Sequence, residues 1–312
     1  MGRSSTAKRN GTRQQKIAAQ RAAARRAQVR RRILVASGSI VAVVAIVVAF
    51  ALVKASSAPG KAAAGSASPT GAALQSLVAE VTGVPNSVLN EVGTGGLSAS
   101  DSGTGNPDNA LATVGGSPLT AGGKPEVLYI GANYCPFCAA QRWAMIIALS
   151  RFGTFSGLTA THSSTSDIYP DTATFTFYGS SYASKYVSFR AVEETENYRQ
   201  GNSNSPSVPY VTLQTPTAAE QALAARYGGT SIPFLDIGNR YVEVGNLAPY
   251  GPRDLAGKSW SQIAAALRDP SSPIAREVDA SANYLTAAIC RLTGNQPASA
   301  ATPAVRAIEA TL

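Results

Sequence analysis

Alternating stretches of apolar and polar residues predict a series of helices and strands that follows one long apolar segment. That segment covers residues 33–53, contains no charged residue and is rich in Val, Ile and Ala. At a rise of about 1.5 Å per residue, a helix of this length spans the roughly 30 Å hydrocarbon core of a bilayer. We therefore expect a transmembrane helix at 33–53.

A cleaved signal peptide is the alternative interpretation of this segment. The stretches Ala49-Phe50-Ala51 and Ala55-Ser56-Ser57-Ala58 resemble the small-residue cleavage sites of signal peptidase. However, the apolar part of a signal peptide is about 7 to 15 residues long, which favours an uncleaved anchor. Either interpretation exports the residues that follow.

Beyond the anchor, the hydrophobic pattern predicts a mixed α/β domain. Apolar runs of strand length, turn residues and helix caps alternate along the chain. The expected elements are a short helix at 72–81, a strand or hairpin at 111–120, a strand at 126–131, an apolar helix at 139–152 ended by Gly153, a strand at 158–162, an antiparallel pair at 175–178 and 187–191, a polar loop at 200–208, a helix capped by Thr217 and Glu220 and closed by Gly228, a hairpin of 234–237 and 240–244, and a long last helix that Gly294 ends.

These elements divide the chain into five expected parts. Residues 1–32 form a basic tail, 33–53 the transmembrane helix and 54–72 a linker rich in Ala, Ser, Gly and Pro, which cannot bury a core. The domain covers 73–294, and 295–312 are expected to form a C-terminal tail.

The positive charge is confined to the basic tail. The chain has a net charge of +9, but residues 1–32 contain eleven of its 27 Lys and Arg residues and no acidic residue, which leaves the rest at −2. By the positive-inside rule the tail lies in the cytoplasm and the domain on the outer side of the cell membrane. The tail has no aromatic residue to stack on bases, so we expect it to contact the lipid bilayer and expect no nucleic-acid partner.

Two cysteines separated by two residues stand between the strand at 126–131 and the apolar helix. The sequence there is Cys135-Pro136-Phe137-Cys138. A thiol at a helix N-terminus meets unpaired N–H groups and the positive end of the helix dipole, which favour the nucleophilic thiolate. The second thiol lies about one turn further along the helix, where it can resolve a mixed disulfide. We therefore expect a redox-active pair.

Two structural roles for this pair are weaker alternatives. A zinc site needs four ligands, and outside the pair the chain offers only Cys290 and a single histidine, His162. A purely structural disulfide over so short a loop would constrain little chain entropy. No nucleotide, haem or metal motif is visible, so we expect no cofactor.

Other residues have candidate roles near the pair. Ile232-Pro233 precedes a predicted strand, a position at which a thioredoxin-like fold has a cis proline that presents backbone groups to an extended substrate peptide. Tyr134 and Arg142 flank the pair, and Trp143 is expected in the core. We expect Cys290 to be a buried apolar residue of the last helix, with a role as a relay thiol as the alternative, and we assign His162 no catalytic role.

The order of elements, β-α-β, an insertion, then α-β-β-α, is that of a thioredoxin-like fold. The stretch from Leu128 to Trp143, together with Ile232-Pro233-Phe234 and Ala288-Ile289-Cys290, resembles the membrane-anchored family called domain of unknown function 929, found in actinobacteria and archaea. The resemblance covers roughly residues 74–294 and implies a thioredoxin-like fold outside the membrane. The Pro-Phe dipeptide is also similar to the active sites of glutaredoxins and periplasmic disulfide oxidases.

One position departs from the thioredoxin pattern. Thioredoxins and disulfide oxidases often have a buried carboxylate about six residues before the first cysteine, where it moves the proton of the second one. Here that position is Tyr129, and Glu126 lies nearer the start of the strand. The resemblance therefore leaves the general base of the resolving step unassigned.

Two functions follow from these features. The first is a membrane-anchored, extracytoplasmic thiol-disulfide oxidoreductase that acts on protein thiols or disulfides through Cys135 and Cys138, binds substrate at Ile232 and Pro233, and is recharged by a membrane or envelope redox partner. The second is a non-enzymatic envelope interaction protein with a permanent Cys135–Cys138 disulfide. The sequence does not choose between oxidase, reductase and isomerase work.

Overall fold

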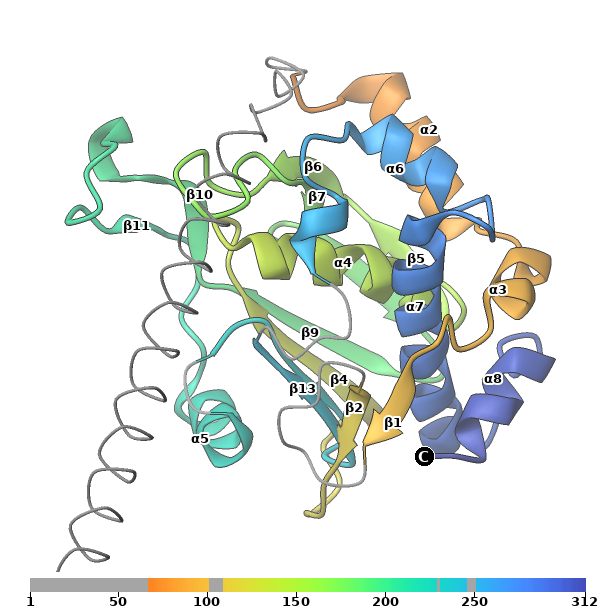
Figure 1. The fold of residues 1–312 in the computed structure, drawn as a ribbon. Coiled ribbons are helices and arrows are strands. Elements are labelled where there is room, and N and C mark those ends of the chain that lie inside the picture. Colours follow the sequence, from red (N-terminus) through yellow and green to blue (C-terminus); the bar gives the residue numbers. More distant parts are fainter. Residues whose placement is uncertain (1–66, 101–108, 229–230, 246–250) are drawn as a thin grey trace, which may run out of the picture. The chain divides into compact units, whose positions relative to one another are not determined.

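The computed structural model describes residues 67–100, 109–228, 231–245 and 251–312 (Figure 1). The chain divides into two units, Met1–Lys61 and Ala62–Leu312, and all described residues belong to the second. The predicted tail at 1–32, the transmembrane helix at 33–53 and most of the linker therefore lie outside the described residues. Within the described ranges, no helix is both long and apolar enough to cross a membrane.

A mixed sheet of seven strands forms the centre of the domain. Its strands are β1 (Ser98–Ser100), β2 (Asn109–Thr113), β3 (Thr120–Ala121), β4 (Lys124–Gly131), β9 (Ser188–Glu193), β12 (Phe234–Ile237) and β13 (Tyr241–Val244). The order is β1-β2-β13-β12-β4-β3, and β9 also pairs with β4. β4 runs parallel to β9 and antiparallel to β12, and β13 runs antiparallel to both β12 and β2. The expected mixed α/β class is therefore confirmed.

Helices cover both faces of this sheet (Figure 1). They are α2 (Gly71–Thr82), α3 (Asn86–Val92), α4 (Pro136–Leu149), α5 (Ala218–Tyr227), α6 (Trp260–Ala266), α7 (Pro273–Thr293) and α8 (Pro303–Glu309), with short 3-10 turns at Gln200–Asn202 and Pro252–Asp254. Side chains alternate between the two faces of a strand. Accordingly, Val127 and Tyr129 of β4 join the large core beneath α4 and α7, whereas Leu128 and Ile130 join a smaller core with Ala224 of α5.

The segment between α4 and β9 forms two small sheets at the edge of the domain. β5 (Gly153–Ser156) pairs with β8 (Ser181–Ser184), and β6 (Thr159–His162) pairs with β7 (Ala173–Thr176). The predicted antiparallel pairing of 175–178 with 187–191 is therefore wrong. The first stretch pairs with β6, and the second is in β9, whose partner is the parallel strand β4.

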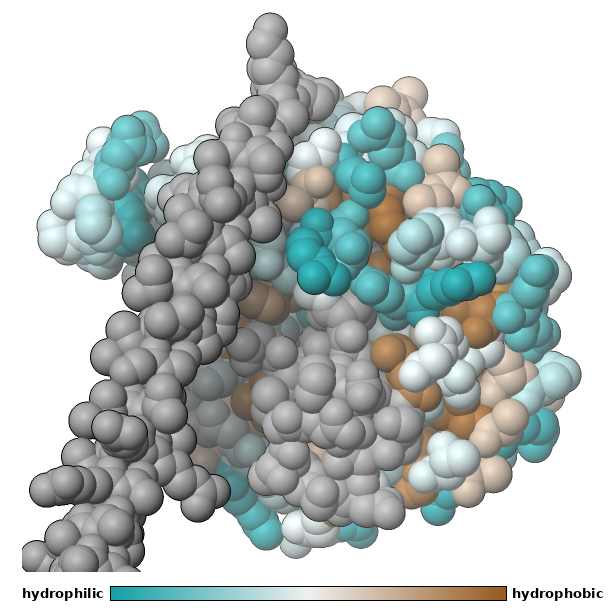
Figure 2. Space-filling model, viewed as in Figure 1, coloured by the Kyte–Doolittle hydropathy of each residue, from teal (hydrophilic) through white to brown (hydrophobic). Residues whose placement is uncertain are grey.

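An arm of two antiparallel strands extends from the end of β9. It consists of β10 (Thr195–Arg199) and β11 (Tyr210–Thr212), joined by the expected polar loop. Figure 1 shows the arm beside the N-terminal end of α4, and Figure 2 shows its outer end as hydrophilic. On the face drawn in Figure 2, hydrophobic residues are interspersed with polar ones over the main body of the domain, outside the arm.

Most other expected elements are present with shifted boundaries. The apolar helix begins at Pro136 rather than 139 and ends at Leu149, so that Gly153 starts a strand instead of closing the helix. The capping box of α5 and the left-handed Gly294 after α7 are confirmed. Residues 295–312, expected to form a tail, contain α8, whose Val305 and Ile308 are buried against the rest of the domain.

Candidate functional site

The Cys135–Cys138 pair lies at the junction of β4 and α4. β4 ends at Gly131, a short turn follows, and Cys135 is the N-cap residue of α4. Pro136 occupies the first helical position, where its missing N–H is not needed and its fixed φ suits the helix. Both cysteines are free thiols in this structure. The local sequence therefore places the first thiol at the helix N-terminus, as expected.

The sulfur of Cys135 accepts the hydrogen bonds expected of a thiolate at this position. The backbone N–H of Cys138 donates to it over 3.3 Å. The Cys138 thiol, which also hydrogen-bonds to this sulfur, lowers the pKa of Cys135 below its ordinary value. The amides of Cys138 and Phe137 and the positive charge of Arg142 act in the same direction, and burial opposes them. The geometry thus favours a reactive anion at Cys135.

The environment of Cys138 has the opposite effect. Its side chain is fully buried. Burial raises the pKa of the Cys138 thiol well above its ordinary value, and the hydrogen bond to Cys135 and the negative charge there add to the rise. Within the reduced pair, Cys135 therefore loses its proton more readily than Cys138 does. This is the division of roles required of a nucleophile and a resolving group.

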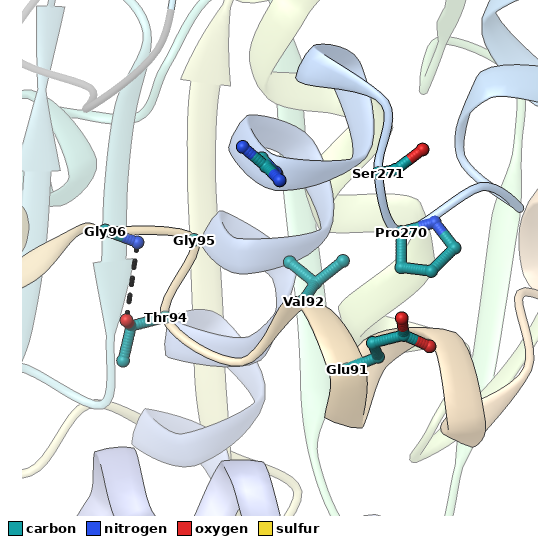
Figure 3. A pocket seen from close by; sticks show the side chains of 8 residues that line it. Glu91, Val92, Thr94, Gly95, Gly96, Pro270 and Ser271 are labelled. Atoms are coloured by element: carbon teal, nitrogen blue, oxygen red, sulfur yellow. Dashed lines mark hydrogen bonds between the residues drawn. The ribbon is translucent and has the colours of Figure 1, made fainter.

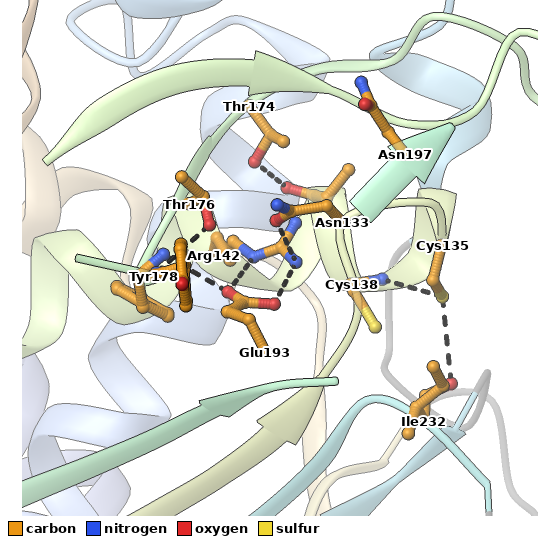
Figure 4. A network of polar contacts seen from close by, with 12 residues as sticks. Asn133, Cys135, Cys138, Arg142, Thr174, Thr176, Tyr178, Glu193, Asn197 and Ile232 are labelled. Atoms are coloured by element: carbon orange, nitrogen blue, oxygen red, sulfur yellow. Dashed lines mark hydrogen bonds and ion pairs between the residues drawn. The ribbon is translucent and has the colours of Figure 1, made fainter. Parts of the chain in front are cut away.

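The loop before β12 approaches the nucleophilic sulfur. The peptide bond between Ile232 and Pro233 is cis, as expected. The carbonyl oxygen of Ile232 lies 4.0 Å from the Cys135 sulfur (Figure 4). The structure therefore brings together all four residues expected at the site from positions about 100 residues apart.

Aromatic side chains stand on two sides of the pair. Tyr134 stacks on Tyr210 of the arm, with ring centroids 4.3 Å apart and planes at 5°. Phe137 meets Tyr169 edge-on at 6.3 Å. Cys135 itself is buried, with 6% of its surface exposed.

A charged pair lies one helical turn beyond Cys138. Arg142 donates to Glu193 of β9 through two nitrogens, over 2.8 Å and 2.6 Å, and both side chains are fully buried (Figure 4). The same guanidinium reaches Asn133 over 3.4 Å, and the amide of Phe177 donates to Glu193. Such a pair withstands burial because two nitrogens of the guanidinium bind the two carboxylate oxygens bidentately.

A second, uncharged pair also links α4 to the sheet. Gln141 donates to Glu243 of β13 over 3.1 Å, and both side chains are buried. Burial raises the pKa of Glu243 to about 8, although the bond from Gln141 lowers it. The other oxygen of each side chain has no partner within the described part of the chain. A protonated Glu243 could donate to the free oxygen of Gln141, so these two side chains suit a neutral acid paired with an amide.

The remaining candidate residues lie away from the sulfur of Cys135. Cys290 is buried in α7, as expected. Trp143 is fully buried and donates from its indole to the carbonyl oxygen of Ala173 over 3.0 Å. His162 ends β6 and lies 3.2 Å from a carboxylate oxygen of Asp171.

A pocket outside this site lies between α3 and the start of α7 (Figure 3). It has a volume of about 420 Å³, and Glu91 and Arg276 are its charged residues. No cysteine or histidine contributes to its lining. The groups able to carry out covalent chemistry are therefore at the thiol pair, not at this pocket.

The sequence profile of the family described as domain of unknown function (DUF929) matches residues 110–291, more than half of the chain. The chain belongs to this family. The DUF929 range contains the thiol pair, Pro233, both buried pairs below α4 and most of α7, whereas α2, α3 and α8 lie outside it. The family expected from the residues around the pair is thereby confirmed. No curated protein and no solved structure matches the chain.

Sequence reasoning missed the partners of two polar residues of the site. Glu193 and Glu243 each come from a strand distant in sequence, so neither had a local signal. The sequence feature that could have indicated these partners lies on α4 itself. Arg142 is the only charged residue in α4, and Gln141 precedes it. A charge on a helix buried almost all round requires a buried partner of opposite charge.

Proposed function

We propose that this protein is a thiol-disulfide oxidoreductase that acts on protein substrates through Cys135 and Cys138. The observation that carries the proposal is the opposed environment of the two sulfurs, one stabilised as a thiolate at a helix N-terminus and the other kept as a thiol by burial. A structural cross-link has no need of such a difference, whereas exchange does.

The reaction follows from these roles. The Cys135 thiolate attacks a substrate disulfide, forms a mixed disulfide and releases one substrate thiolate. Cys138 then loses its proton and attacks the Cys135 sulfur, the mixed disulfide breaks, and the second substrate sulfur leaves and is protonated. The substrate disulfide gains two electrons and the pair is oxidised. The reverse sequence oxidises a substrate dithiol, and stabilisation of the Cys135 thiolate favours that oxidising direction.

The arrangement of elements supports a thioredoxin-like fold for this chemistry. β9, β4, β12 and β13 are consecutive in the sheet, with only the β4–β9 pairing parallel. α4 and α7 pack on one face and α5 on the other, and a cis proline precedes β12. In this arrangement Ile232 and Pro233 would present backbone groups to an extended substrate chain. The insertion would then be the segment between α4 and β9, inside the β-α-β unit and not after it as the sequence predicted, because the strand at 159–162 pairs with β7 and the parallel partner of β4 is β9.

The proposed site of action is the outer side of the cell membrane. The apolar run at 33–53 and the Arg-rich residues before it support a single anchor with a cytoplasmic N-terminus. An oxidising compartment is also where disulfide exchange on protein substrates takes place. A membrane or envelope redox partner would restore the pair after each turnover.

Trapping of the intermediate tests this proposal. In a Cys138→Ser variant, Cys135 can still attack a substrate but the resolving thiol is gone, so a mixed disulfide with envelope proteins should accumulate. Cys135→Ser/Cys138→Ser is the matched control and should trap nothing. Absence of any mixed disulfide with Cys138→Ser, in a folded and membrane-bound protein, would contradict the proposal.

The second candidate is a non-enzymatic interaction protein with a permanent disulfide. The low exposure of Cys135, 6%, favours it, because a sealed sulfur cannot meet a protein substrate. Alkylation of the reduced native protein separates the two candidates. Rapid modification of Cys135 supports exchange, and modification only after unfolding supports the structural role.

A further inference from the structure

The resolving step presents a specific electrostatic problem. Cys138 must become an anion at a position where burial raises its pKa well above the ordinary value. The backbone N–H of Cys138 cannot stabilise this anion, because it already donates a hydrogen bond to the Cys135 sulfur. Some other group must stabilise charge on Cys138 while it attacks the mixed disulfide.

Two buried donors near Cys138 have no hydrogen-bond partner among the described residues. They are the hydroxyl of Tyr129 and one terminal nitrogen, Nη1, of Arg142. Both side chains are fully buried, and the guanidinium lies over the Tyr129 ring, 5.9 Å from its centroid. An unsatisfied buried donor costs about 1 to 3 kcal/mol, so two of them at one place require an explanation.

The path of the Tyr129 side chain directs its hydroxyl toward the thiols. A Cβ placed on Gly131 would lie 2.1 Å from that hydroxyl oxygen, so the side chain extends along β4 toward the end that leads into the pair. The next residue, Ala132, hydrogen-bonds through its backbone to the Cys138 sulfur. The hydroxyl therefore lies beside Gly131, one residue before the Ala132 backbone group that hydrogen-bonds to the Cys138 sulfur.

The charges around Cys138 fit the same role. The positive charge of Arg142 lowers the pKa of both thiols. Burial raises the pKa of Tyr129 well above its ordinary value, so this residue remains a neutral hydrogen-bond donor. The ionisable groups that interact with Cys138 are Cys135 at the N-cap of α4, Arg142 of α4, Tyr129 of β4 and Tyr134 of the turn between them, and Glu193 of β9 acts through its ion pair with Arg142.

We propose that the Tyr129 hydroxyl and the Arg142 guanidinium, held in place by Glu193, stabilise the Cys138 thiolate that resolves the mixed disulfide. This inference rests on the oxidoreductase function proposed above. During the step Cys138 gives up its proton, the new sulfur–sulfur bond forms as the bond to substrate breaks, and the leaving substrate sulfur is protonated. The Tyr129 hydroxyl, which has no hydrogen-bond partner among the described residues of the reduced protein, donates to the Cys138 anion as it forms, and it neither gains nor loses a proton.

The test is a comparison of Tyr129→Phe with the unchanged full-length protein. A mixed disulfide between Cys135 and glutathione is formed with oxidised glutathione, and release of glutathione is followed by rapid acid quench and mass spectrometry between pH 5 and 9. Loss of one hydrogen bond to an anion should slow release about tenfold at pH 7 and move its pH midpoint upward. Alkylation of Cys135 should keep its rate, because the first step does not use this hydroxyl.

Tyr284→Phe is the matched control. It also removes a buried hydroxyl, which donates to the carbonyl oxygen of Leu97 over 2.7 Å, but from α7 rather than from the site. It should change stability without changing the pH midpoint of glutathione release. Wild-type release rate and midpoint in Tyr129→Phe would overturn the inference. Failure of the unchanged protein to form the mixed disulfide would instead overturn the proposed function.

The contribution of Arg142 needs variants that fold. Removal of one partner of a buried pair leaves a lone buried charge, so Arg142→Gln is combined with Glu193→Gln, which keeps hydrogen-bonding groups at both positions while removing both charges. Release should be slower than in the unchanged protein, with a raised midpoint, and Arg142→Lys should restore part of the rate. A folded double variant with an unchanged midpoint would exclude Arg142 from the role.

Discussion

Two buried cysteines on two long helices show how position within a helix decides the chemistry of a thiol. Cys135 caps the start of α4, where hydrogen bonds from Cys138 lower its pKa. Cys290 lies in the last turn of α7, where burial raises its pKa to about 12 and the charge of Glu309 adds to the rise. The start of a helix offers free N–H donors to an anion, whereas its end offers carbonyl oxygens. The same side chain therefore has a lowered pKa at one position and a raised pKa at the other.

The largest expected effect comes from removing each thiol in turn. Cys135→Ser should abolish disulfide exchange with a model substrate such as oxidised glutathione, because the only stabilised sulfur anion is lost. Cys290→Ala should keep exchange at the wild-type rate. Glutathione mixed-disulfide formation, measured by mass spectrometry, checks both.

The comparison fails if Cys290→Ala also abolishes exchange in a folded protein. That result would make Cys290 the relay thiol of the alternative interpretation. Circular dichroism of both variants serves as the control for folding.

A second prediction measures both thiols within one molecule. In Cys138→Ser, the serine hydroxyl can still donate to Cys135, and Cys290 is unchanged. Iodoacetamide at pH 7 should modify Cys135 at least ~100-fold faster than Cys290, because the thiolate is the reactive form and Cys290 is buried with a raised pKa. Peptide mass spectrometry gives the two rates. Equal alkylation rates at Cys135 and Cys290 in the native protein would contradict the predicted difference between the two thiols.

A third prediction concerns the pH dependence of stability, which Glu243 should affect without changing the reactivity of Cys135. Burial holds the pKa of Glu243 at about 8 in the folded protein, against an ordinary value of 4.5. The folded state therefore keeps a proton that the unfolded state releases. The contribution of Glu243 to the free energy of unfolding is greatest below about pH 4.5, and it falls by at most about 1.4 kcal/mol per pH unit as the pH rises toward 8.

Glu243→Gln should remove this part of the pH dependence, since the amide cannot ionise. Urea unfolding at pH 5 and pH 7.5 measures it, with Glu80→Gln on the exposed surface of α2 as the control. The rate of Cys135 alkylation should not change. A Glu243→Gln variant with the same pH dependence of stability as the unchanged protein would contradict a buried, protonated Glu243.

The smallest expected effect concerns packing at Cys290. Its side chain is fully buried in the core, so Cys290→Ala leaves a small cavity and should lower the free energy of unfolding by about 1 kcal/mol. Urea unfolding measures the change. A gain in stability would show that the thiol is strained rather than packed.

Local pattern predicted the parts of the fold that depend on neighbouring residues. The strand before the pair, the capping box of α5 and the glycine that ends α7 all have signals within a few positions, whereas the hairpin after β12 has a loop of three residues, 238–240, and not the predicted loop of two. The helix N-terminus at Cys135 also has such local signals. These signals determine the chemistry of the nucleophile, which is why the thiol pair could be located from sequence.

Long-range pairing could not be predicted in this way. The alternation of residues in β9 is equally consistent with an antiparallel hairpin and with the parallel pairing to β4 that the structure has. The partners of Arg142 and Gln141 lie 51 and 102 residues away, on strands whose neighbours depend on the whole sheet. The partners of Arg142 and Gln141 could therefore be identified only from the structure.

The reduction potential of the Cys135–Cys138 couple tests the central claim most directly. It is measured on the full-length protein by equilibration with glutathione buffers and alkylation of the free thiols. A stabilised thiolate at Cys135 makes the disulfide easier to reduce, so we predict a potential above about −300 mV. A value below about −300 mV, together with a Cys135 pKa near the ~8.5 of a free thiol, would contradict the account and identify a structural disulfide.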